Sequence, residues 1–195
     1  LVVAAGHTTA SYTEMQEAVT WGIDHVTHFY NAMRGLHHRE PGVVGAGLTL
    51  QELYLEVIAD GIHVHPGALR LAYQAKGPRR LMLVTDAVEY AGMAEGVYEE
   101  GDRKLLVENG SIRMQDGTLA GSTLTMDQAV ALMVRQVGAP LEEAIAMASS
   151  VPAERLGLSN RKGSLTPGKD ADLVVLDDHF DVQLTAVSGN IIFQR

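Results

Sequence analysis

The stretch Thr27-His28-Phe29-Tyr30-Asn31-Ala32-Met33 follows a short run of β-forming residues and begins a polar loop with a histidine. A histidine at the end of a strand is typical of the place where α/β barrels carry their chemistry. The pattern recurs at Gly6-His7, at Asp60-Gly61-Ile62-His63 and at Thr85-Asp86, each time after an apolar run. The recurrence predicts parallel strands whose carboxyl ends gather polar side chains at one rim.

Residues 1–90 alternate between short apolar runs and helix-forming segments. The strands that we expect are Leu1–Ala5, His25–His28, Tyr54–Ala59 and Leu81–Val84. The helices that we expect are Thr13–Trp21, Gly42–Leu48 and Pro66–Lys76. This alternation indicates βαβ units and a parallel sheet, and apolar strands indicate a sheet covered on both faces.

The composition changes after residue 91, where Gly, Glu and Asp become frequent. Lys104–Glu108 and Ser111–Met114 flank Asn109-Gly110, a strong signal for a β-hairpin. We therefore expect an excursion of β-structure at about 92–118. After it we expect helices at Leu124–Val137 (capped by Ser122 or Thr123), Leu141–Ser149 and Pro152–Leu156, and then strands at Leu173–Leu176, Val182–Val187 and Ile191–Phe193.

Length and composition restrict the possible functions. An apolar share of 46% allows a sizeable core, and a net charge of −9 argues against nucleic acid as the main partner. The chain has no cysteine, which excludes disulfides, thiolate metal sites and cysteine nucleophiles. No apolar run approaches the roughly 20 residues of a membrane span, and no signal peptide is recognisable. We expect a cytoplasmic protein without a membrane partner.

The histidines at the strand ends have two interpretations. If His7 and His28 converge at one rim, neutral imidazoles could bind a divalent metal such as zinc. The alternative is that each is a capping or hydrogen-bonded histidine. Asp86 at the same rim could take a proton from a metal-activated water, or could cap a loop.

Other histidines are more ambiguous. His63-Val64-His65 could hold a metal on a strand, but Asp60-Gly61 breaks the strand, so we expect a loop in which one ring contacts substrate and the other is structural. His25 lies on the opposite strand face from His28 and is expected to pack. The basic cluster of residues 37–39 is either a solvated loop or a site for a phosphate or carboxylate.

Several longer motifs point to a family. They are Gly6-His7-Thr8, residues 27–33, Ala59-Asp60-Gly61-Ile62-His63-Val64, Val84-Thr85-Asp86-Ala87 and Leu119-Ala120-Gly121-Ser122-Thr123-Leu124-Thr125-Met126. In this order they resemble the N-acetylglucosamine-6-phosphate deacetylase family of the amidohydrolase superfamily. Residues 163–175 are similar to the superfamily's return into a small β domain, a less specific pattern.

The resemblance implies metal-dependent hydrolysis of the acetamide of N-acetylglucosamine 6-phosphate, giving glucosamine 6-phosphate and acetate. It implies that His7 and His28 bind the metal, which would be zinc, iron or another divalent ion, and that Asp86 is the catalytic acid and base. The implied substrate contacts are His63, Asn31 and Ala32 (the last two at the phosphate), Leu119, Ala120 and Gly121 near the sugar and acetyl group, and Arg39, which would reach the substrate of a neighbouring subunit in a homodimer.

The resemblance also implies an α/β fold: the second half of a TIM-like (β/α)8 barrel at 1–160, and strands of a small β-sandwich domain at 161–195. A full barrel needs about 250 residues, and the family's metal-binding glutamate and an earlier substrate histidine have no match here. We therefore expect the chain to be part of a longer protein. The alternatives are another amidohydrolase, such as one for the galactosamine isomer or a cyclic amidase, and an incomplete fragment with a structural role.

Overall fold

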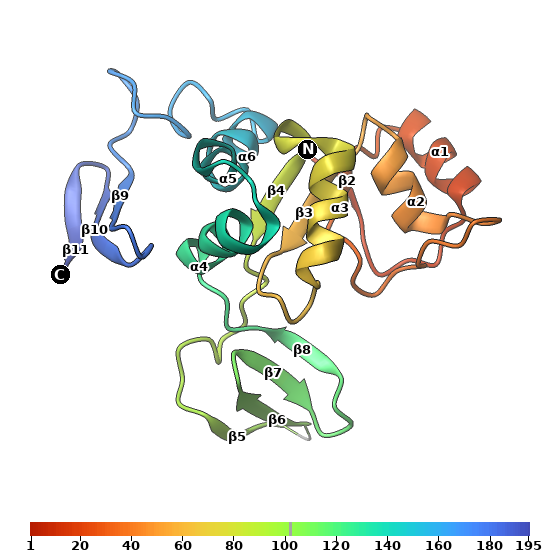
Figure 1. Ribbon diagram of the computed structural model, residues 1–195, viewed down its shortest axis with the longest axis horizontal. Helices are drawn as coiled ribbons and strands as arrows, with labels where there is room; N and C mark the ends of the chain where they lie inside the picture. The colour runs from red at the N-terminus through yellow and green to blue at the C-terminus, as the bar shows by residue number, and fades with distance from the viewer. Residues whose placement is uncertain (102) are drawn as a thin grey trace.

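The computed structural model describes residues 1–101 and 103–195, and it is built around a four-stranded parallel sheet (Figure 1). The strands lie in chain order: β1 (Ala4–Ala5), β2 (His25–Val26), β3 (Tyr54–Ile58) and β4 (Leu81–Val84). Each strand pairs in parallel with the next. The loops that leave their carboxyl ends therefore meet along one edge, and the α/β class is confirmed.

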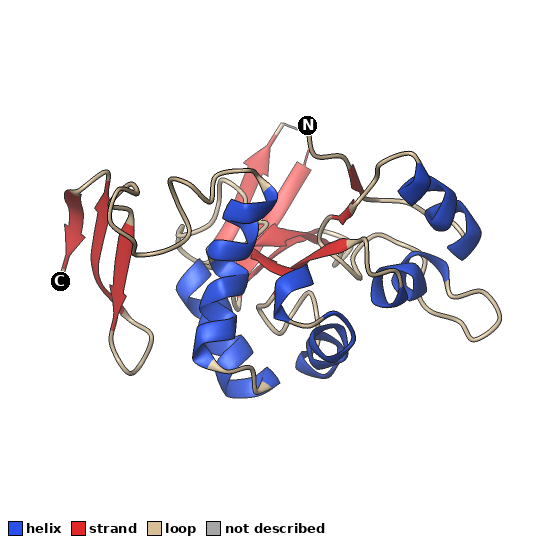
Figure 2. Ribbon diagram, turned by 90° about the horizontal axis from the view of Figure 1, so that it is seen from above, coloured by secondary structure: helices blue, strands red, loops and turns tan. Residues whose placement is uncertain are grey.

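Helices connect and cover these strands. They are α1 (Tyr12–Thr20), α2 (Gly42–Thr49), α3 (Pro66–Lys76), the 3₁₀ turn η1 (Pro78–Arg80), α4 (Met126–Leu132), α5 (Leu141–Ala148) and α6 (Ser150–Arg155). Figure 2 shows them gathered on one side of the parallel sheet. Among the described residues, no helix has the length and apolar character needed to cross a membrane.

Local signals explain three of the helix ends. Ser11 accepts a hydrogen bond from the amide of Glu14, and the Glu14 carboxylate accepts one from the amide of Ser11, so α1 begins with a capping box. Helix α3 begins with Pro66 in its first turn and ends before Gly77, whose φ of 67° suits a residue without Cβ. Both helices start and end within one residue of their expected bounds.

The expected excursion is an antiparallel sheet, in the order β5 (Gly96–Glu100), β6 (Arg103–Glu108), β7 (Ser111–Met114) and β8 (Leu119–Ser122). Asn109 and Gly110 form its central turn with φ values of 47° and 76°, which confirms the predicted hairpin. The sheet extends to Ser122, past the expected end of the excursion at about 118, and includes Leu119, Ala120 and Gly121. Residue 102 of the excursion lies outside the described residues.

The helix after the excursion begins later than expected. Helix α4 begins at Met126 after Thr125, without a side-chain cap, and its final turn widens into a π-helix, η2 (Met133–Val137). Neither Ser122 nor Thr123 caps it, because Ser122 belongs to β8 and its hydroxyl donates to the Thr85 carbonyl. The Ser122 hydroxyl, which the local pattern assigned to the cap of α4, therefore takes part in a tertiary contact with Thr85 instead.

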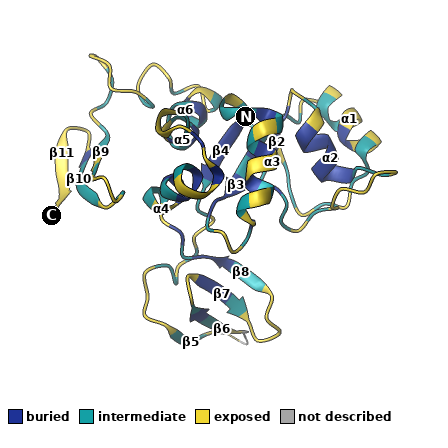
Figure 3. Cartoon of the chain, in the orientation of Figure 1, coloured by how far each residue is buried: buried dark blue, intermediate teal, exposed yellow. Residues whose placement is uncertain are grey.

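The last strands form a separate antiparallel sheet, in the order β11 (Asn190–Gln194), β10 (Val182–Val187) and β9 (Leu173–Leu176). It lies at the left of Figure 1, away from the parallel sheet. Every residue of β11 is exposed, and Figure 3 shows the contrast with the buried strands β3 and β4. The sequence predicted a strand at each of β9, β10 and β11.

The main core lies between the parallel sheet and its helices. Its fully buried members include Phe29, Leu55, Ile58, Leu69 and Met133. Helix α2 approaches this core closely, because a Cβ at Gly47 would overlap the Phe29 ring. A smaller core of Leu105, Val107 and Ile112 lies within the β5–β8 sheet.

One buried cation gives the fold a testable pH dependence. Lys76 in the last turn of α3 is 6% exposed, and its Nζ donates to the Leu50 carbonyl at 2.5 Å. Burial, followed by the charge of Arg80, lowers the pKa of Lys76 from 10.5 to about 8. Between these pH values the folded protein binds fewer protons than the unfolded chain. The free energy of unfolding should therefore rise with pH from about 8 to 10.5 through this group.

Urea unfolding at several pH values checks this expectation in the wild type and in Lys76→Met. The wild type should gain stability relative to Lys76→Met as the pH rises through that interval. Lys104→Met removes an exposed ammonium group and serves as the control. A constant stability difference between wild type and Lys76→Met would contradict the prediction.

Candidate active site

Three residues at the carboxyl ends of the parallel strands have an unusual backbone. His7 follows β1, His28 follows β2 and Asp86 follows β4, and their φ values are 46°, 30° and 50°. Left-handed backbone is uncommon outside glycine, and such conformations cluster at functional sites. The residues expected to bind metal and to catalyse therefore share both a rim and a strained conformation.

The rings of His7 and His28 lie against each other. Their centroids are 4.7 Å apart, in an edge-on arrangement. His28 Nδ1 is buried and has no hydrogen-bond partner among the residues that the structure describes. A buried nitrogen without a partner requires an explanation, and an imidazole nitrogen is a good metal ligand. The pair therefore fits one part of a metal site.

The fit is only partial. Within residues 1–101 and 103–195, no group of three or more His, Cys, Asp or Glu side chains is arranged to hold a metal ion. A catalytic zinc site normally has three protein ligands. His7 and His28 therefore provide two ligands of a set that the described residues do not complete.

Thr27 connects the two histidine-bearing strand ends. Its amide donates to the Ala5 carbonyl at 3.0 Å, and its hydroxyl donates to Glu56 at 2.7 Å. A Cβ at Gly6 would overlap the Thr27 methyl group, so only glycine allows β1 and β2 to approach so closely here. This contact sets how near His7 and His28 lie to each other.

Glu56 was not singled out from the sequence. It also lies 3.0 Å from His25 Nε2. Burial raises the pKa of the Glu56 carboxyl, but the hydrogen bonds from His25 and Thr27 outweigh burial and hold it below its ordinary value. His25 is buried, as expected of a packing residue, but it also belongs to this polar network.

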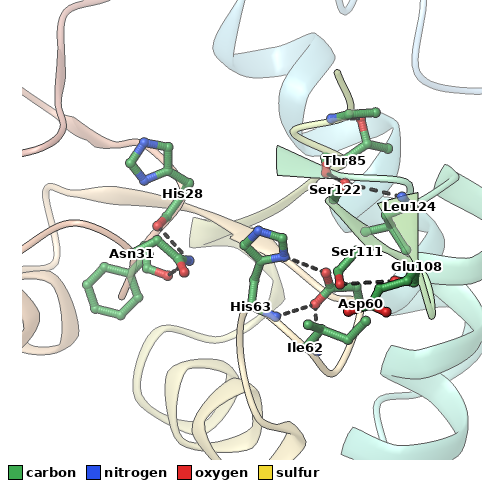
Figure 4. A network of polar contacts seen from close by, with 12 residues as sticks. His28, Asn31, Asp60, Ile62, His63, Thr85, Glu108, Ser111, Ser122 and Leu124 are labelled. Atoms are coloured by element: carbon green, nitrogen blue, oxygen red, sulfur yellow. Dashed lines mark hydrogen bonds and ion pairs between the residues drawn. The ribbon is translucent and has the colours of Figure 1, made fainter. Parts of the chain in front are cut away.

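The loop after β3 holds His63 against Asp60. The Asp60 carboxylate contacts His63 Nδ1 at 2.6 Å and accepts hydrogen bonds from the amides of Ile62 and His63 (Figure 4). His65 has a different role, since its Nδ1 accepts from the Gly67 amide at the start of α3. The structure thus confirms that His63-Val64-His65 lies in a loop with one structural histidine.

The Asp86 loop is joined to strand β8. The Ser122 amide donates to the Asp86 carbonyl at 3.1 Å, and Ala87 pairs with Ser122 in a parallel bridge. Gly121 has a φ of 136° and packs directly against Val88. The structure therefore places the end of strand β8, at Gly121 and Ser122, beside the loop that carries Asp86.

The other expected substrate contacts lie in the loops after β2. The Asn31 side chain donates to the His28 carbonyl at 3.1 Å, and Ala32 has a φ of 50°. Arg39 is exposed, and its guanidinium contacts His38 at 2.7 Å. Asn31 and Ala32 thus belong to the same loop as His28. Arg39 lies further along the chain, on an exposed segment.

Comparison with known proteins supports the resemblance drawn from the motifs. The sequence matches the amidohydrolase family over residues 1–192. N-acetylglucosamine-6-phosphate deacetylase from Vibrio furnissii is 42% identical over 191 residues, which are 98% of this chain and 48% of that protein. N-acetylgalactosamine-6-phosphate deacetylase from Escherichia coli is 45% identical over 189 residues, which are 97% of this chain and 50% of that protein.

A solved structure agrees with these likenesses. It is a mutant of N-acetyl-D-glucosamine-6-phosphate deacetylase from Mycobacterium smegmatis, in complex with N-acetyl-D-glucosamine-6-phosphate. It has a TM-score of 0.91 and 39% identity, and the match covers 98% of this chain and 51% of that one. The chain spans about half the length of the curated relatives named above. It belongs to the amidohydrolase family.

Proposed function

We propose that this chain is part of a deacetylase that hydrolyses the acetamide of N-acetylglucosamine 6-phosphate to glucosamine 6-phosphate and acetate. The observation that carries the proposal is the rim of the parallel sheet. There His7, His28 and Asp86 all have left-handed backbone, and the Asp60–His63 pair follows the strand between them. The relatives named for this reaction match nearly the whole chain.

The proposed architecture follows from the sheet order. Four parallel strands in chain order form an arc that would make the second half of a (β/α)8 barrel within residues 1–160. The β9–β11 sheet within residues 161–195 would contribute to a small β-sandwich, which suits its exposed apolar side chains. The match covers about half of the Mycobacterium chain, as expected if this chain contributes half of such a barrel.

Amidohydrolases are generally dependent on a divalent metal, and we propose zinc, with iron or another divalent ion as alternatives. His7 and His28 would hold it, which accounts for the buried and unpartnered Nδ1 of His28. When bound, such an ion polarises a carbonyl and lowers the pKa of water. The strained loops at both histidines would hold the two rings at the rim before any ion binds.

Each remaining side chain has a proposed task in the reaction. Asp86 takes a proton from the attacking water and returns it to the leaving nitrogen. His63 contacts the sugar, beside the strand of Leu119, Ala120 and Gly121. Asn31 and Ala32 hold the phosphate, and the left-handed φ of Ala32 supports this because alternating backbone handedness forms anion-binding concavities. We propose a cytoplasmic homodimer in which Arg39 reaches the neighbouring subunit's phosphate.

Acetate release from N-acetylglucosamine 6-phosphate tests the function. The protein is assayed with added Zn²⁺ and, separately, with chelator, and unphosphorylated N-acetylglucosamine is the control substrate. We expect turnover of the phosphorylated sugar that the chelator abolishes. Equal rates with and without the phosphate would contradict the assigned substrate class, and no acetate under any condition would favour a catalytically incomplete chain.

The galactosamine isomer is a second candidate substrate. The Escherichia coli relative named for it is 45% identical to this chain, as similar as the relatives named for the glucosamine substrate. The ratio of kcat/KM for the two phosphorylated epimers decides between them. A larger value for N-acetylgalactosamine 6-phosphate would replace the first assignment.

A further inference from the structure

The Asp60 carboxylate makes three polar contacts within its own loop. Oδ1 accepts from the amides of Ile62 and His63, both at 2.8 Å, and Oδ2 contacts His63 Nδ1 at 2.6 Å. The side chains of Asp60 and His63 are each 5% exposed. Buried polar contacts of this kind define one arrangement strongly, because leaving any member unpaired is costly.

The contacts of the Asp60 carboxylate determine which His63 nitrogen faces it as a donor. Burial raises the pKa of the Asp60 carboxyl, but the hydrogen bonds from the His63 ring and from the two amides outweigh burial and hold it below its ordinary value. An ionised carboxylate can only accept hydrogen bonds, so Nδ1 of His63 must carry the proton. In a neutral ring the other nitrogen, Nε2, is then a bare acceptor.

Two other elements lie beside the loop that carries the pair. Gly61 has a φ of 76°, and a Cβ at that position would lie 3.3 Å from Leu132 of helix α4. Ile62 packs against the β6–β7 turn, 3.6 Å from the position of a Cβ on Gly110. The β6–β7 turn and α4 therefore both lie near the segment between Asp60 and His63.

The bare nitrogen faces away from Asp60. In Figure 4 the His63 ring lies between Asp60 and His28, with Nε2 on the side opposite the carboxylate. Nε2 makes no hydrogen bond to any residue in the described part of the chain. It is thus an oriented acceptor, at the rim, for a donor that the protein itself does not supply.

We propose that Asp60 is a positioning residue that holds His63 in the tautomer with a bare Nε2, and that this nitrogen accepts a hydrogen bond from a hydroxyl of the amino-sugar phosphate. The second part rests on the proposed function. The first part concerns only the protein and is tested without substrate.

The Asp60→Asn variant should change the tautomer of His63 without disturbing the fold of the loop. The asparagine oxygen can still accept from the amides of Ile62 and His63, but its NH₂ group then faces Nδ1 and must donate. His63 would switch to the tautomer protonated on Nε2, which repels a hydroxyl hydrogen. An inverted tautomer of this kind is known to impair a catalytic histidine without moving it.

The test combines nitrogen-15 NMR of the imidazole rings with kinetics. His63→Gln assigns the His63 signals, and Asp116→Asn is the matched control, because Asp116 also accepts an amide hydrogen bond but lies in an exposed turn. In the wild type and in Asp116→Asn we expect the Nδ1-protonated form. In Asp60→Asn we expect the opposite tautomer and a kcat/KM about 10- to 100-fold lower.

The outcomes separate the two proposals. An Nε2-protonated His63 in the wild type, or an unchanged tautomer in Asp60→Asn, would overturn the role of Asp60. A switched tautomer with unchanged kcat/KM would overturn the hydroxyl contact. If no deacetylation is detectable in the wild type, the result favours a catalytically incomplete chain and removes the support for the hydroxyl contact, while the tautomer measurement still decides the role of Asp60. If Asp60→Asn does not fold, the wild-type tautomer alone decides it.

Discussion

Asp86→Asn should lower kcat for deacetylation about 100- to 10,000-fold, the range for loss of a positioned acid and base. The amide that replaces the carboxylate has nearly the same shape, but it cannot take a proton from water or return one to the leaving nitrogen. Asparagine also tolerates the left-handed φ of 50° at this position. The contact of the Ser122 amide with the residue-86 carbonyl involves only the backbone and should persist.

The measurement is steady-state acetate release, with circular dichroism and metal content as checks on fold and loading. Glu89→Gln removes an exposed carboxylate from the same loop and serves as the matched control. We expect the control to retain full activity and Asp86→Asn to retain the metal. Activity of Asp86→Asn within about threefold of the wild type, a loss far smaller than that expected for general acid–base catalysis, would remove Asp86 from that role.

In the full-length protein, His28→Ala should abolish divalent-metal binding at the rim, and with it turnover. Loss of a side chain that hydrogen-bonds to a metal ligand costs about 10- to 100-fold in metal affinity, so loss of the ligand itself should cost more. Alanine fits the φ of 30° at this position less well than histidine, so some loss of stability is expected as well. His28→Asn tolerates that backbone and separates metal loss from unfolding.

Metal content after dialysis and the absorption spectrum of added Co²⁺ measure this effect directly. His179→Ala is the control, because His179 lies in the exposed turn between β9 and β10. The wild type and the control should bind equally. Unchanged metal content in both His28 variants would show that His28 is not a ligand.

Local signals were sufficient for much of the fold. Helix α3 and strand β4 have the predicted bounds, because Pro66 and Gly77 mark the helix and an uninterrupted apolar run marks the strand. Asn109-Gly110 marked the hairpin for the same kind of reason, since both residues favour left-handed backbone. The start of α4 was wrong because Ser122, a good local cap, is used in the contact between β8 and the loop after β4.

Some features of the candidate site could likewise be predicted from the sequence, and others could not. The order of residues in the chain was enough to place His7, His28 and Asp86 at one rim, because parallel strands put their carboxyl ends together. Asp60 was also visible in the sequence, three residues before His63, but only as a residue that breaks a strand. Its hydrogen bonds depend on how the loop after β3 closes, and that is seen only in the structure.

The sequence by itself determined the class of the fold, the rim where chemistry is expected and the family, because these depend on residue types and on their order along the chain. Only the tertiary structure decided how the rim is held. Glu56 meets Thr27 across neighbouring strands, Thr27 meets Gly6, and the pair of His7 and His28 is fixed by these contacts. Such contacts join segments that are distant in the chain, so no local pattern of residues specifies them.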